Sequence, residues 1–244
     1  MPLALSVVVP VKDEAGNAAP LAREIAQALT AVGPHEIIFV DDGSTDGTAA
    51  ELTALRAEIP QLRVLRHKRN LGQSRAVRSG VLAAKGAIIG TLDGDGQNDP
   101  ADLPRLLAEM KRLNTSSGGN VAMVGGVRVK RKDTASRRMA SKIGNGFRNW
   151  MLKDGAADTG CGIKVLEREA YLALPYFDHQ HRFLIALMRR EGYGVGFLPV
   201  GHRPRGAGVS KYTNFGRMLV SINDLLGMRW LISRHRGPAG TEEL

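Results

Sequence analysis

The amino-acid sequence predicts an α/β fold, in which helices cover both faces of a mostly parallel sheet. Two observations predict it. Apolar, β-rich runs alternate with helical segments from residue 5 to residue 127. The run that precedes Asp93, Ala87–Leu92, is apolar except for Thr91, which is typical of a strand buried on both faces. This β-α-β-α succession indicates parallel strands joined by helices.

The expected elements follow one another along this part of the chain. The strands are expected at Leu5–Pro10, His35–Val40, Leu62–His67, Ala87–Leu92 and Val121–Val127. The helices are expected at Asn17–Ala31, Thr45–Glu58, Gln73–Ala84 and Pro100–Leu113. For the last helix, Asp99 is the expected N-cap and Pro100 the first helical residue, where a proline loses no hydrogen bond.

The composition is that of a globular protein with a basic surface. The chain has 244 residues, a formal net charge of +10 and a single cysteine, Cys161, which excludes an intramolecular disulfide and suits a reducing compartment. The charge favours anionic partners such as phosphorylated substrates or anionic lipid headgroups. Aromatic residues make up only 5% of the chain and no nucleic-acid motif is present, so no nucleic acid is expected as a partner.

The protein is expected on the cytoplasmic side of a membrane. Its first residues, Met1–Pro10, carry no basic segment before the apolar run and do not resemble a signal peptide. No uninterrupted apolar stretch is long enough to span a bilayer. Contact with a membrane would therefore be peripheral.

Two aspartates directly follow the strand expected at Ala87–Leu92. Asp93 and Asp95 lie one residue apart, and the amide of Gln97 follows them. Ligands of open α/β sheets bind outside the carboxyl ends of the strands. Carboxylate and amide oxygens are the ligands that Mg²⁺ or Mn²⁺ prefers, commonly shared with substrate phosphates. The stretch predicts a metal-diphosphate site, although an isolated Asp-Gly-Asp is more typical of an Asp/Gly-rich surface turn.

Two other strands end in polar loops at the same expected edge of the sheet. The first strand leads into Pro10–Glu14 and the second into Val40–Thr48. Acidic side chains at such strand ends accept hydrogen bonds from the base or ribose of a nucleotide. The second loop alone would also serve as a turn with a helix cap. Its position beside the two other polar strand ends favours a nucleotide site.

These segments together resemble a known enzyme family. The motifs, in chain order, are Val8–Glu14, Val40–Thr48, Asn70–Gln73 with Gly80, Asp93–Gln97, and Arg205 through Ser210–Tyr212. This series is similar to the family 2 glycosyltransferases of GT-A fold, a Rossmann-like fold. Within this family it resembles the dolichol-phosphate mannose synthases and the bacterial polyprenyl-phosphate glycosyltransferases. The resemblance covers about residues 4–233.

The resemblance implies a nucleotide-diphosphate sugar as donor, either GDP-mannose or a UDP-hexose. The residues implied at the nucleoside are Pro10, Lys12, Glu14, Val40 and Asp42. Lys12 stands where relatives often have an aromatic residue, and its alkyl stem would cover the base. The resemblance also implies that Asp93 contacts the donor, and that Asp95 and Gln97, with Asp93, hold Mg²⁺ or Mn²⁺ against the diphosphate.

The resemblance implies a polyprenyl phosphate of the dolichyl or undecaprenyl type as acceptor. Arg128, Arg138 and Ser141 match positions that hold the lipid phosphate, and a guanidinium grips phosphate oxygens through paired hydrogen bonds. Arg205 and Lys211 match a loop that closes over the donor diphosphate. The implied reaction is a single displacement with inversion. A phosphate monoester is already anionic near neutral pH, so no general base is needed.

The expected organisation is a catalytic domain at residues 1–212, a C-terminal amphipathic helix within 213–236, and a tail at 237–244. Apolar residues recur at helical spacing in Phe215–Arg236 and are followed by Arg234 and Arg236. This helix either packs on the sheet or lies on the membrane surface, with Trp230 at headgroup level. The enzyme would then reach its lipid acceptor by peripheral binding on the cytoplasmic face or through a separate membrane subunit.

Several alternatives remain open at this stage. The chain would also fit a family 2 transferase with a non-polyprenyl acceptor, or a catalytically silent basic membrane-binding subunit. An EF-hand is disfavoured because Asn98 occupies its glycine position. The spacing of His179 and His181 permits a metal site, but no carboxylate–histidine pattern surrounds them. The sequence determines neither the sugar nor the base.

Overall fold

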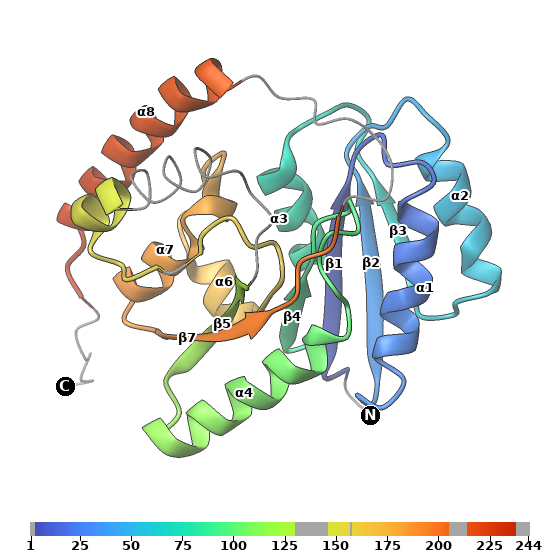
Figure 1. Ribbon diagram of the computed structural model, residues 1–244, viewed down its shortest axis with the longest axis horizontal. Coiled ribbons are helices and arrows are strands. Elements are labelled where there is room, and N and C mark those ends of the chain that lie inside the picture. Colours follow the sequence, from blue (N-terminus) through green and yellow to red (C-terminus); the bar gives the residue numbers. More distant parts are fainter. Residues whose placement is uncertain (1–2, 130–145, 157, 205–213, 238–244) are drawn as a thin grey trace, which may run out of the picture.

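The computed structural model describes residues 3–129, 146–156, 158–204 and 214–237, and its centre is one seven-stranded sheet (Figure 1). The strands are β1 Leu5–Val11, β2 His35–Asp41, β3 Leu62–Arg66, β4 Ile88–Thr91, β5 Val121–Arg128, β6 Lys164–Glu167 and β7 Gly194–Val200. Their order across the sheet is β3-β2-β1-β4-β6-β5-β7. Only β6 among them is antiparallel to its neighbours.

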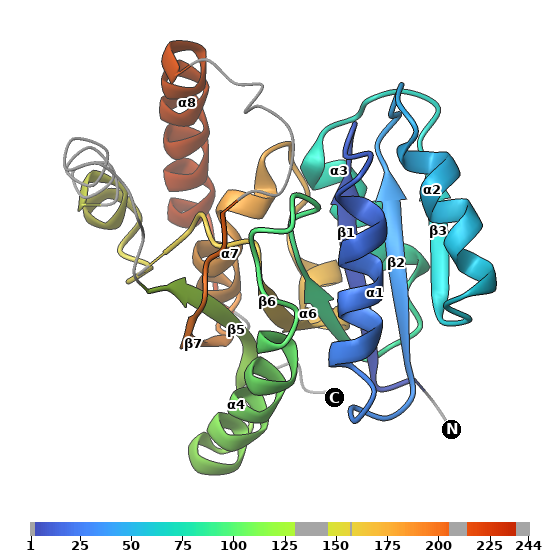
Figure 2. The ribbon, with the colours of Figure 1, turned by 45° about the vertical axis from the view of Figure 1, so that its right-hand side comes forward.

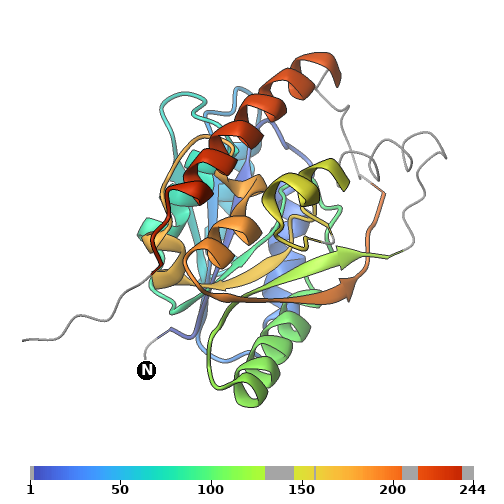
Figure 3. The ribbon, with the colours of Figure 1, turned by 90° about the vertical axis from the view of Figure 1, so that its left-hand side faces the viewer.

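Helices cover both faces of this sheet, as the sequence predicts (Figures 2 and 3). The α-helices include α1 Ala18–Ala28, α2 Thr48–Ala54, α3 Gln73–Ala83, α4 Asp102–Ser117, α6 Arg168–Ala173, α7 Leu184–Arg190 and α8 Asn214–Ser233. A further helix spans residues 146–152. Short 3-10 turns occur at η1 Leu55–Ala57 and η2 Gln180–Arg182.

Two apolar cores hold these layers together. One lies between the sheet and helices α1, α2 and α4, and the other between the sheet and helices α3, α6, α7 and α8. Successive residues of β1 show how both are filled: Val7 and Val9 face the first core, and Val8 faces the second. Each of the three is fully buried. The parallel central strands are therefore apolar on both faces, which is why their sequence does not alternate.

Every strand and helix that the sequence predicts up to residue 127 is present, with small differences at the ends. At the start of α4, the prediction of Asp99 as N-cap is wrong. The helix begins at Asp102, with Ala101 at the N-cap. Asp99 instead accepts a hydrogen bond from the backbone N–H of Ala101, at 3.0 Å, in the turn before the helix. Proline at position 100 lies in this turn.

A helix is also present where the sequence predicts the C-terminal one. Within α8, Leu225 and Met228 are buried in the second core. Ile222, Leu226 and Trp230 are exposed. None of the helices in the described ranges has both the length and the apolar character that a membrane span requires.

Helix α3 lies unusually close to the sheet at Gly80. A Cβ atom at this position would lie 2.4 Å from Cγ1 of Val8 and 3.1 Å from Cγ2 of Val40. We expect Gly80→Ala to lower the free energy of unfolding by about 1–3 kcal/mol, because overpacking displaces the buried valines. Urea unfolding followed by circular dichroism measures the change.

The matched control is Gly227→Ala in α8, where no atom lies within 4 Å of the added Cβ. There alanine is expected to be neutral or to stabilise, by up to about 1 kcal/mol, because it is the better helix former. Equal effects of the two substitutions would contradict the close approach of α3 to β1.

Candidate active site

The sheet brings five chain segments to one edge. The strands β1, β2 and β4 are parallel, so their carboxyl ends, which lead into Pro10, Asp42 and Asp93, lie at the same edge. Since β6 runs antiparallel to both its neighbours, its first residue, Lys164, pairs with Thr91 of β4 and Gly125 of β5. The end of β5, at Arg128, therefore also lies at this edge.

Two adjoining pockets open at this edge. The β1–β2 pocket, of about 460 Å³, is lined by Pro10, Val11, Lys12, Glu14, Asp42, Asn70, Gly72, Gln73, Asp93, Gly94 and Asp95. The β4–β6 pocket, of about 350 Å³, is lined by Pro10, Gly72, Gln73, Val77, Thr91, Leu92, Asp93, Thr159–Gly162, Lys164, Asp178, His179, His181, Arg182 and Leu184. Both share Asp93, which therefore stands at their junction.

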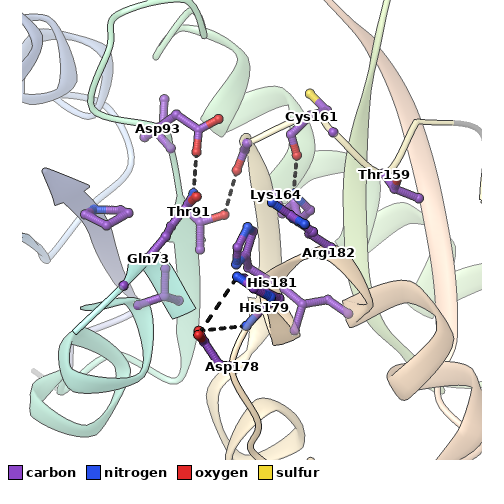
Figure 4. A pocket seen from close by; sticks show the side chains of 17 residues that line it. Gln73, Thr91, Asp93, Thr159, Cys161, Lys164, Asp178, His179, His181 and Arg182 are labelled. Carbon is purple, nitrogen blue, oxygen red and sulfur yellow. Dashed lines mark hydrogen bonds and ion pairs between the residues drawn. The ribbon is translucent and has the colours of Figure 1, made fainter. Parts of the chain in front are cut away.

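Asp93 is fixed from two sides (Figure 4). The side-chain amide of Gln73 donates to its Oδ1 at 2.9 Å. On the other side lies Gly162, where a Cβ atom would come within 2.2 Å of Oδ2. Burial raises the pKa of the Asp93 carboxyl, the Lys164 ammonium opposes this shift, and the charge of Asp95 adds to it. The carboxylate is thus held where a cation would stabilise it.

The residues predicted to hold a metal have suitable donor atoms. Asp95 Oδ1 accepts the backbone N–H of Gln97 at 3.2 Å, and this places both residues in one tight loop. The side-chain nitrogen of Gln97 donates to the carbonyl of Arg203 at 3.5 Å, which leaves the amide oxygen for a cation. Within the described ranges no group of three or more His, Cys, Asp or Glu side chains gathers. The chain therefore fits a hard cation that takes its remaining ligands from phosphates and water.

Asp42 lines the β1–β2 pocket and also holds one of its walls. Its two carboxylate oxygens accept the backbone N–H groups of Leu71 and Gly72, each at 2.8 Å. The Nδ1 atom of His67 lies 2.7 Å from Oδ1. Because these contacts use much of its hydrogen-bonding capacity, Asp42 shapes the pocket through the loop at residues 70–72.

Only some of the other residues predicted to contact the nucleoside line a pocket. Pro10, Lys12 and Glu14 line the β1–β2 pocket with Asp42. Val40 lines neither pocket, because its side chain is fully buried in the second core under α3. The Nζ atom of Lys12 contacts the Gly43 carbonyl at 3.4 Å, so the ammonium lies over the loop that follows β2.

Of the residues predicted to bind the lipid phosphate, Arg128 lies within the part of the chain that the structure describes. Its Nε and Nη2 atoms donate to the two oxygens of Asp158, at 2.7 and 2.8 Å, and this pairing raises the pKa of the guanidinium. A Cβ atom on Gly160, a lining residue of the β4–β6 pocket, would lie 2.8 Å from Nη2 of Arg128. The arginine therefore stands directly behind the wall of this pocket. Arg138, Ser141, Arg205 and Lys211 lie outside the described residues.

The structure adds Lys164, His181 and Arg182 to the pocket, none of which the sequence predicts as site residues. Lys164 donates a hydrogen bond to the carbonyl oxygen of Cys161. Gly160 and Gly162 stand shortly before Lys164 in the sequence, but they do not reveal that β6 returns antiparallel to the Asp93 edge. The sequence feature that could have indicated Lys164, His181 and Arg182 is weak: each is a polar residue close to a glycine or a histidine in the chain.

The two histidines do not form a metal site together. Nδ1 of His181 shares a hydrogen bond of 2.7 Å with Ser74, whereas Nδ1 of His179 lies 2.9 Å from Asp224 of α8. Cys161 is buried, and burial raises the pKa of its thiol, which disfavours a thiolate nucleophile.

Burial lowers the pKa of His181 from 6.5 to about 3, so the folded protein keeps this ring neutral. In the unfolded chain the ring takes up a proton below about pH 6.5, and stability is therefore lost as the pH falls. Between pH 7 and pH 5 we expect this ring to cost about 2 kcal/mol of the free energy of unfolding. Urea unfolding at both pH values measures the loss.

In His181→Gln most of this pH dependence should be absent. His35→Gln, at a surface position where Nδ1 contacts the Gly33 carbonyl, is the control and should follow the wild type. A slope that is the same in all three proteins would be inconsistent with a neutral, buried His181.

The sheet, the paired pockets and the Asp-x-Asp loop at their junction define a glycosyltransferase of GT-A fold. The sequence model of "Glycosyl transferase family 2" matches residues 6–173, and the chain belongs to this family. The chain is thus an enzyme that transfers a sugar, as the sequence resemblance implies.

Two relatives are 33% identical to the chain over the aligned residues. The dodecaprenyl-phosphate galacturonate synthase of Rhizobium johnstonii is 33% identical over 236 residues, which are 94% of this chain and 68% of the relative. The undecaprenyl-phosphate 4-deoxy-4-formamido-L-arabinose transferase of Klebsiella pneumoniae is 33% identical over 224 residues, 91% of this chain and 66% of the relative. The chain therefore spans about two-thirds of the length of each.

Solved structures support the fold. Glucosyl-3-phosphoglycerate synthase from Mycobacterium tuberculosis, in complex with Mn²⁺, UDP-glucose and glycerol 3-phosphate, superposes with a TM-score of 0.70 at 16% identity. This match covers 97% of this chain and 82% of the other. The same enzyme with Mn²⁺, UDP and its product gives a TM-score of 0.71 at 17% identity, over 97% and 81% of the two chains. At this identity the likeness concerns the fold alone.

Proposed function

We propose that this glycosyltransferase moves a sugar from a nucleoside diphosphate to a polyprenyl phosphate at a membrane surface. The observation that carries the proposal is the position of Asp93, which stands where the β1–β2 and β4–β6 pockets meet. A transferase needs its donor and its acceptor on either side of one reacting carbon. Both curated relatives are named as enzymes of polyprenyl phosphates, which supports the same acceptor here.

The β1–β2 pocket is the proposed donor site. Pro10, Lys12 and Glu14 would surround the nucleoside, and Asp95 and Gln97 would hold Mg²⁺ or Mn²⁺. The bound cation would neutralise the charge that develops on the departing diphosphate. The M. tuberculosis enzyme of the same fold binds Mn²⁺ with UDP, or Mg²⁺ with UDP, which supports this choice of cation. Arg205 and Lys211, outside the described residues, are proposed to contact the same diphosphate.

The β4–β6 pocket is the proposed place of the sugar and of the attacking phosphate. An oxygen of the lipid phosphate forms the new bond to the anomeric carbon. The bond from this carbon to the diphosphate oxygen breaks, and its electron pair leaves with the nucleoside diphosphate. Because the two groups lie on opposite sides of the carbon, the configuration inverts. The phosphate carries its negative charge already, so the chain contributes mainly positioning.

Arg128 is the proposed anchor of the lipid phosphate behind this pocket, with Arg138 and Ser141 from outside the described residues. Its pairing with Asp158 aligns the guanidinium in one plane before any ligand binds. An arginine oriented in this way presents its remaining N–H groups to a phosphate. The attack would then come from the β5 side of Asp93.

Incubation with a panel of UDP- and GDP-sugars, Mg²⁺ or Mn²⁺ and a short polyprenyl phosphate tests the function. We expect metal-dependent formation of a lipid-phosphate-linked sugar with inverted configuration, determined by NMR of the isolated product. Transfer to a soluble acceptor but never to the lipid would show a family 2 transferase of another acceptor class. If neither transfer nor donor hydrolysis occurs, the better explanation is a membrane-binding subunit that has no catalytic activity.

Two adjoining helices expose apolar side chains that suit a membrane surface. On α8, Ile222, Leu226 and Trp230 follow one another at intervals of four residues and therefore share one face. On the helix at residues 146–152, Phe147 and Trp150 are exposed, with ring centroids 5.9 Å apart. Arg229 of α8 donates to the backbone carbonyl of Met151 at 2.9 Å, which links the two helices.

We call these five side chains the aromatic patch and propose that it lies in the headgroup layer of the cytoplasmic membrane face. Tryptophans are favoured at that depth, and the basic surface of the chain attracts anionic lipid. The exposed arginines at 229, 234 and 236 follow or border the patch. This position would bring the pockets to a lipid-bound acceptor without a membrane span in the described chain.

The double substitution Trp150→Ser with Trp230→Ser is expected to reduce flotation with vesicles of anionic phospholipid by at least about tenfold. Withdrawing one buried aromatic side chain from an apolar medium costs roughly 1.5–3 kcal/mol. The control is Leu82→Ser, since Leu82 is equally exposed but lies on α3. If the double variant floats as well as the wild type, contact through the aromatic patch is ruled out and a separate membrane subunit becomes the better explanation.

A further inference from the structure

The β4–β6 pocket contains a buried cation that no carboxylate of the described chain neutralises by direct contact. Lys164 is 7% exposed and lines the pocket. Its ammonium donates to the carbonyl oxygen of Cys161, and within the described ranges it forms no ion pair. Burying an ammonium costs several kcal/mol unless an anion accompanies it. A ligand that brings an anion to this position would recover part of this cost.

A second cation reaches the same pocket from another element. Arg182 belongs to the turn η2, and its guanidinium makes no hydrogen bond or ion pair with the described residues. Figure 4 shows both side chains among the residues that line the pocket. An ammonium and a guanidinium that converge on one cavity form a site for a small anion with two or three oxygens.

The place of Lys164 identifies which substrate carries this anion. In the sheet Lys164 pairs with Thr91, two residues before Asp93. Gly162 packs against the Asp93 carboxylate, so the segment that positions Lys164 also forms the floor under Asp93. If Asp93 contacts the donor where sugar and diphosphate join, the sugar lies directly over Lys164.

The acceptor phosphate is assigned to a different cation. Arg128, at the end of β5 and behind Gly160, is the proposed anchor of that phosphate. The diphosphate of the donor lies at Asp95 and its cation, in the other pocket. With the acceptor phosphate assigned to Arg128 and the donor diphosphate to Asp95 and its cation, the group left for Lys164 and Arg182 is a charge on the transferred sugar.

We propose that Lys164 and Arg182 bind a carboxylate on the donor sugar, so that the transferred residue is a hexuronic acid. This inference rests on the proposed function and names the substrate class of the same site. A neutral hexose would give neither cation an ion-pair partner, and such sites reject the analogue that lacks the charged group. Lys164 and Arg182 are thus specificity residues for the sugar, and Asp95 serves the diphosphate of any donor.

The test compares donors that differ only at carbon 6 of the sugar. The pairs are UDP-galacturonic acid with UDP-galactose, UDP-glucuronic acid with UDP-glucose, and GDP-mannuronic acid with GDP-mannose. Calorimetry with Mg²⁺ measures their dissociation constants without requiring turnover. We expect at least one hexuronic acid donor to bind at least tenfold more tightly than its neutral counterpart.

Two variants test whether Lys164 and Arg182 cause the preference for a hexuronic acid donor. Lys164→Met is expected to weaken binding of the preferred hexuronic acid donor at least tenfold and that of its neutral counterpart less than threefold. Arg182→Gln should have a smaller effect in the same direction, and it carries the test alone if Lys164→Met does not fold. Lys111→Met, on the exposed side of α4, removes the same charge far from the pocket and should bind both donors as the wild type does.

Equal affinity for both members of every pair would overturn the proposal. So would a loss in Lys164→Met that is the same for both donors and is accompanied by a raised KM for polyprenyl phosphate, because the two cations would then serve the lipid phosphate. A different result would refute the proposed function: neither UDP nor GDP would bind in the presence of Mg²⁺. Tight binding of a hexuronic acid donor without transfer to polyprenyl phosphate would support the sugar class and refute the acceptor.

Discussion

Asp95→Ala is expected to reduce sugar transfer by a factor of about 10³ or more, while the fold remains intact. Asp95 lies at the surface of the β1–β2 pocket, in a loop closed by the hydrogen bond from the Gln97 N–H. Removing a ligand of the cation withdraws stabilisation worth several kcal/mol from the departing diphosphate, and about 4 kcal/mol corresponds to that factor. Transfer to a short polyprenyl phosphate, measured over a range of Mn²⁺ concentrations, gives the effect.

The control for this loss is Asp99→Ala, four residues further along the same acidic loop. Asp99 pairs with Arg203 at 2.7 Å and lines neither pocket. We expect it to change the rate less than threefold. If Asp95→Ala retains both transfer and dependence on the divalent cation, then Asp95 does not hold the metal, and the assignment of the Asp-x-Asp loop as the diphosphate clamp is wrong.

Gly162→Ala is expected to reduce sugar transfer by a factor of about 10², without removing a reacting group. The added Cβ would lie 2.2 Å from Oδ2 of Asp93 and 2.8 Å from the side-chain oxygen of Asn98. The backbone cannot retreat, because the Gly162 carbonyl accepts a hydrogen bond of 2.8 Å from Thr91 and the next carbonyl accepts the Gly126 N–H at 3.0 Å. Asp93 must therefore move, and a misplacement of about 1 Å costs about 10²-fold in rate.

Steady-state kinetics and thermal unfolding separate this effect from a general loss of stability. The matched control is Gly125→Ala on β5, where the nearest atom would lie 3.8 Å from the added Cβ. We expect the control to be close to wild type in rate, and Gly162→Ala to lose rate in excess of any change in Tm. A fully active Gly162→Ala would show that the position of Asp93 is not critical for transfer.

The sequence predicted the central part of the fold because its signals there are local. The strands that carry Pro10, Asp42 and Asp93 are short apolar runs followed at once by polar loops, and helices at the expected places join them. Parallel topology alone then brings these three strand ends to one edge. The error at α4 is small: Asp99 still accepts a backbone N–H, but it lies three residues before the first helical residue, Asp102.

The sequence was less informative about Val40 and Asp42. The family resemblance implies that both contact the nucleoside. The Val40 side chain, however, faces α3 in the second core. Side-chain direction in a strand depends on which helix covers which face, and a strand that is apolar throughout does not reveal this. Asp42 does reach its pocket, but the loop at residues 70–72, distant in the chain, occupies much of its carboxylate.

The sequence by itself determined the first five strands, the motif order and the acidic strand end, because each depends on neighbouring residues. Only the tertiary structure decided the second half of the site. The strand β6 returns antiparallel between β4 and β5, and this places Lys164 beside Asp93, 71 positions earlier in the chain. The turn η2 then brings Arg182 to the same cavity. Such contacts arise from long-range strand pairing and burial, for which a stretch of sequence carries no local signal.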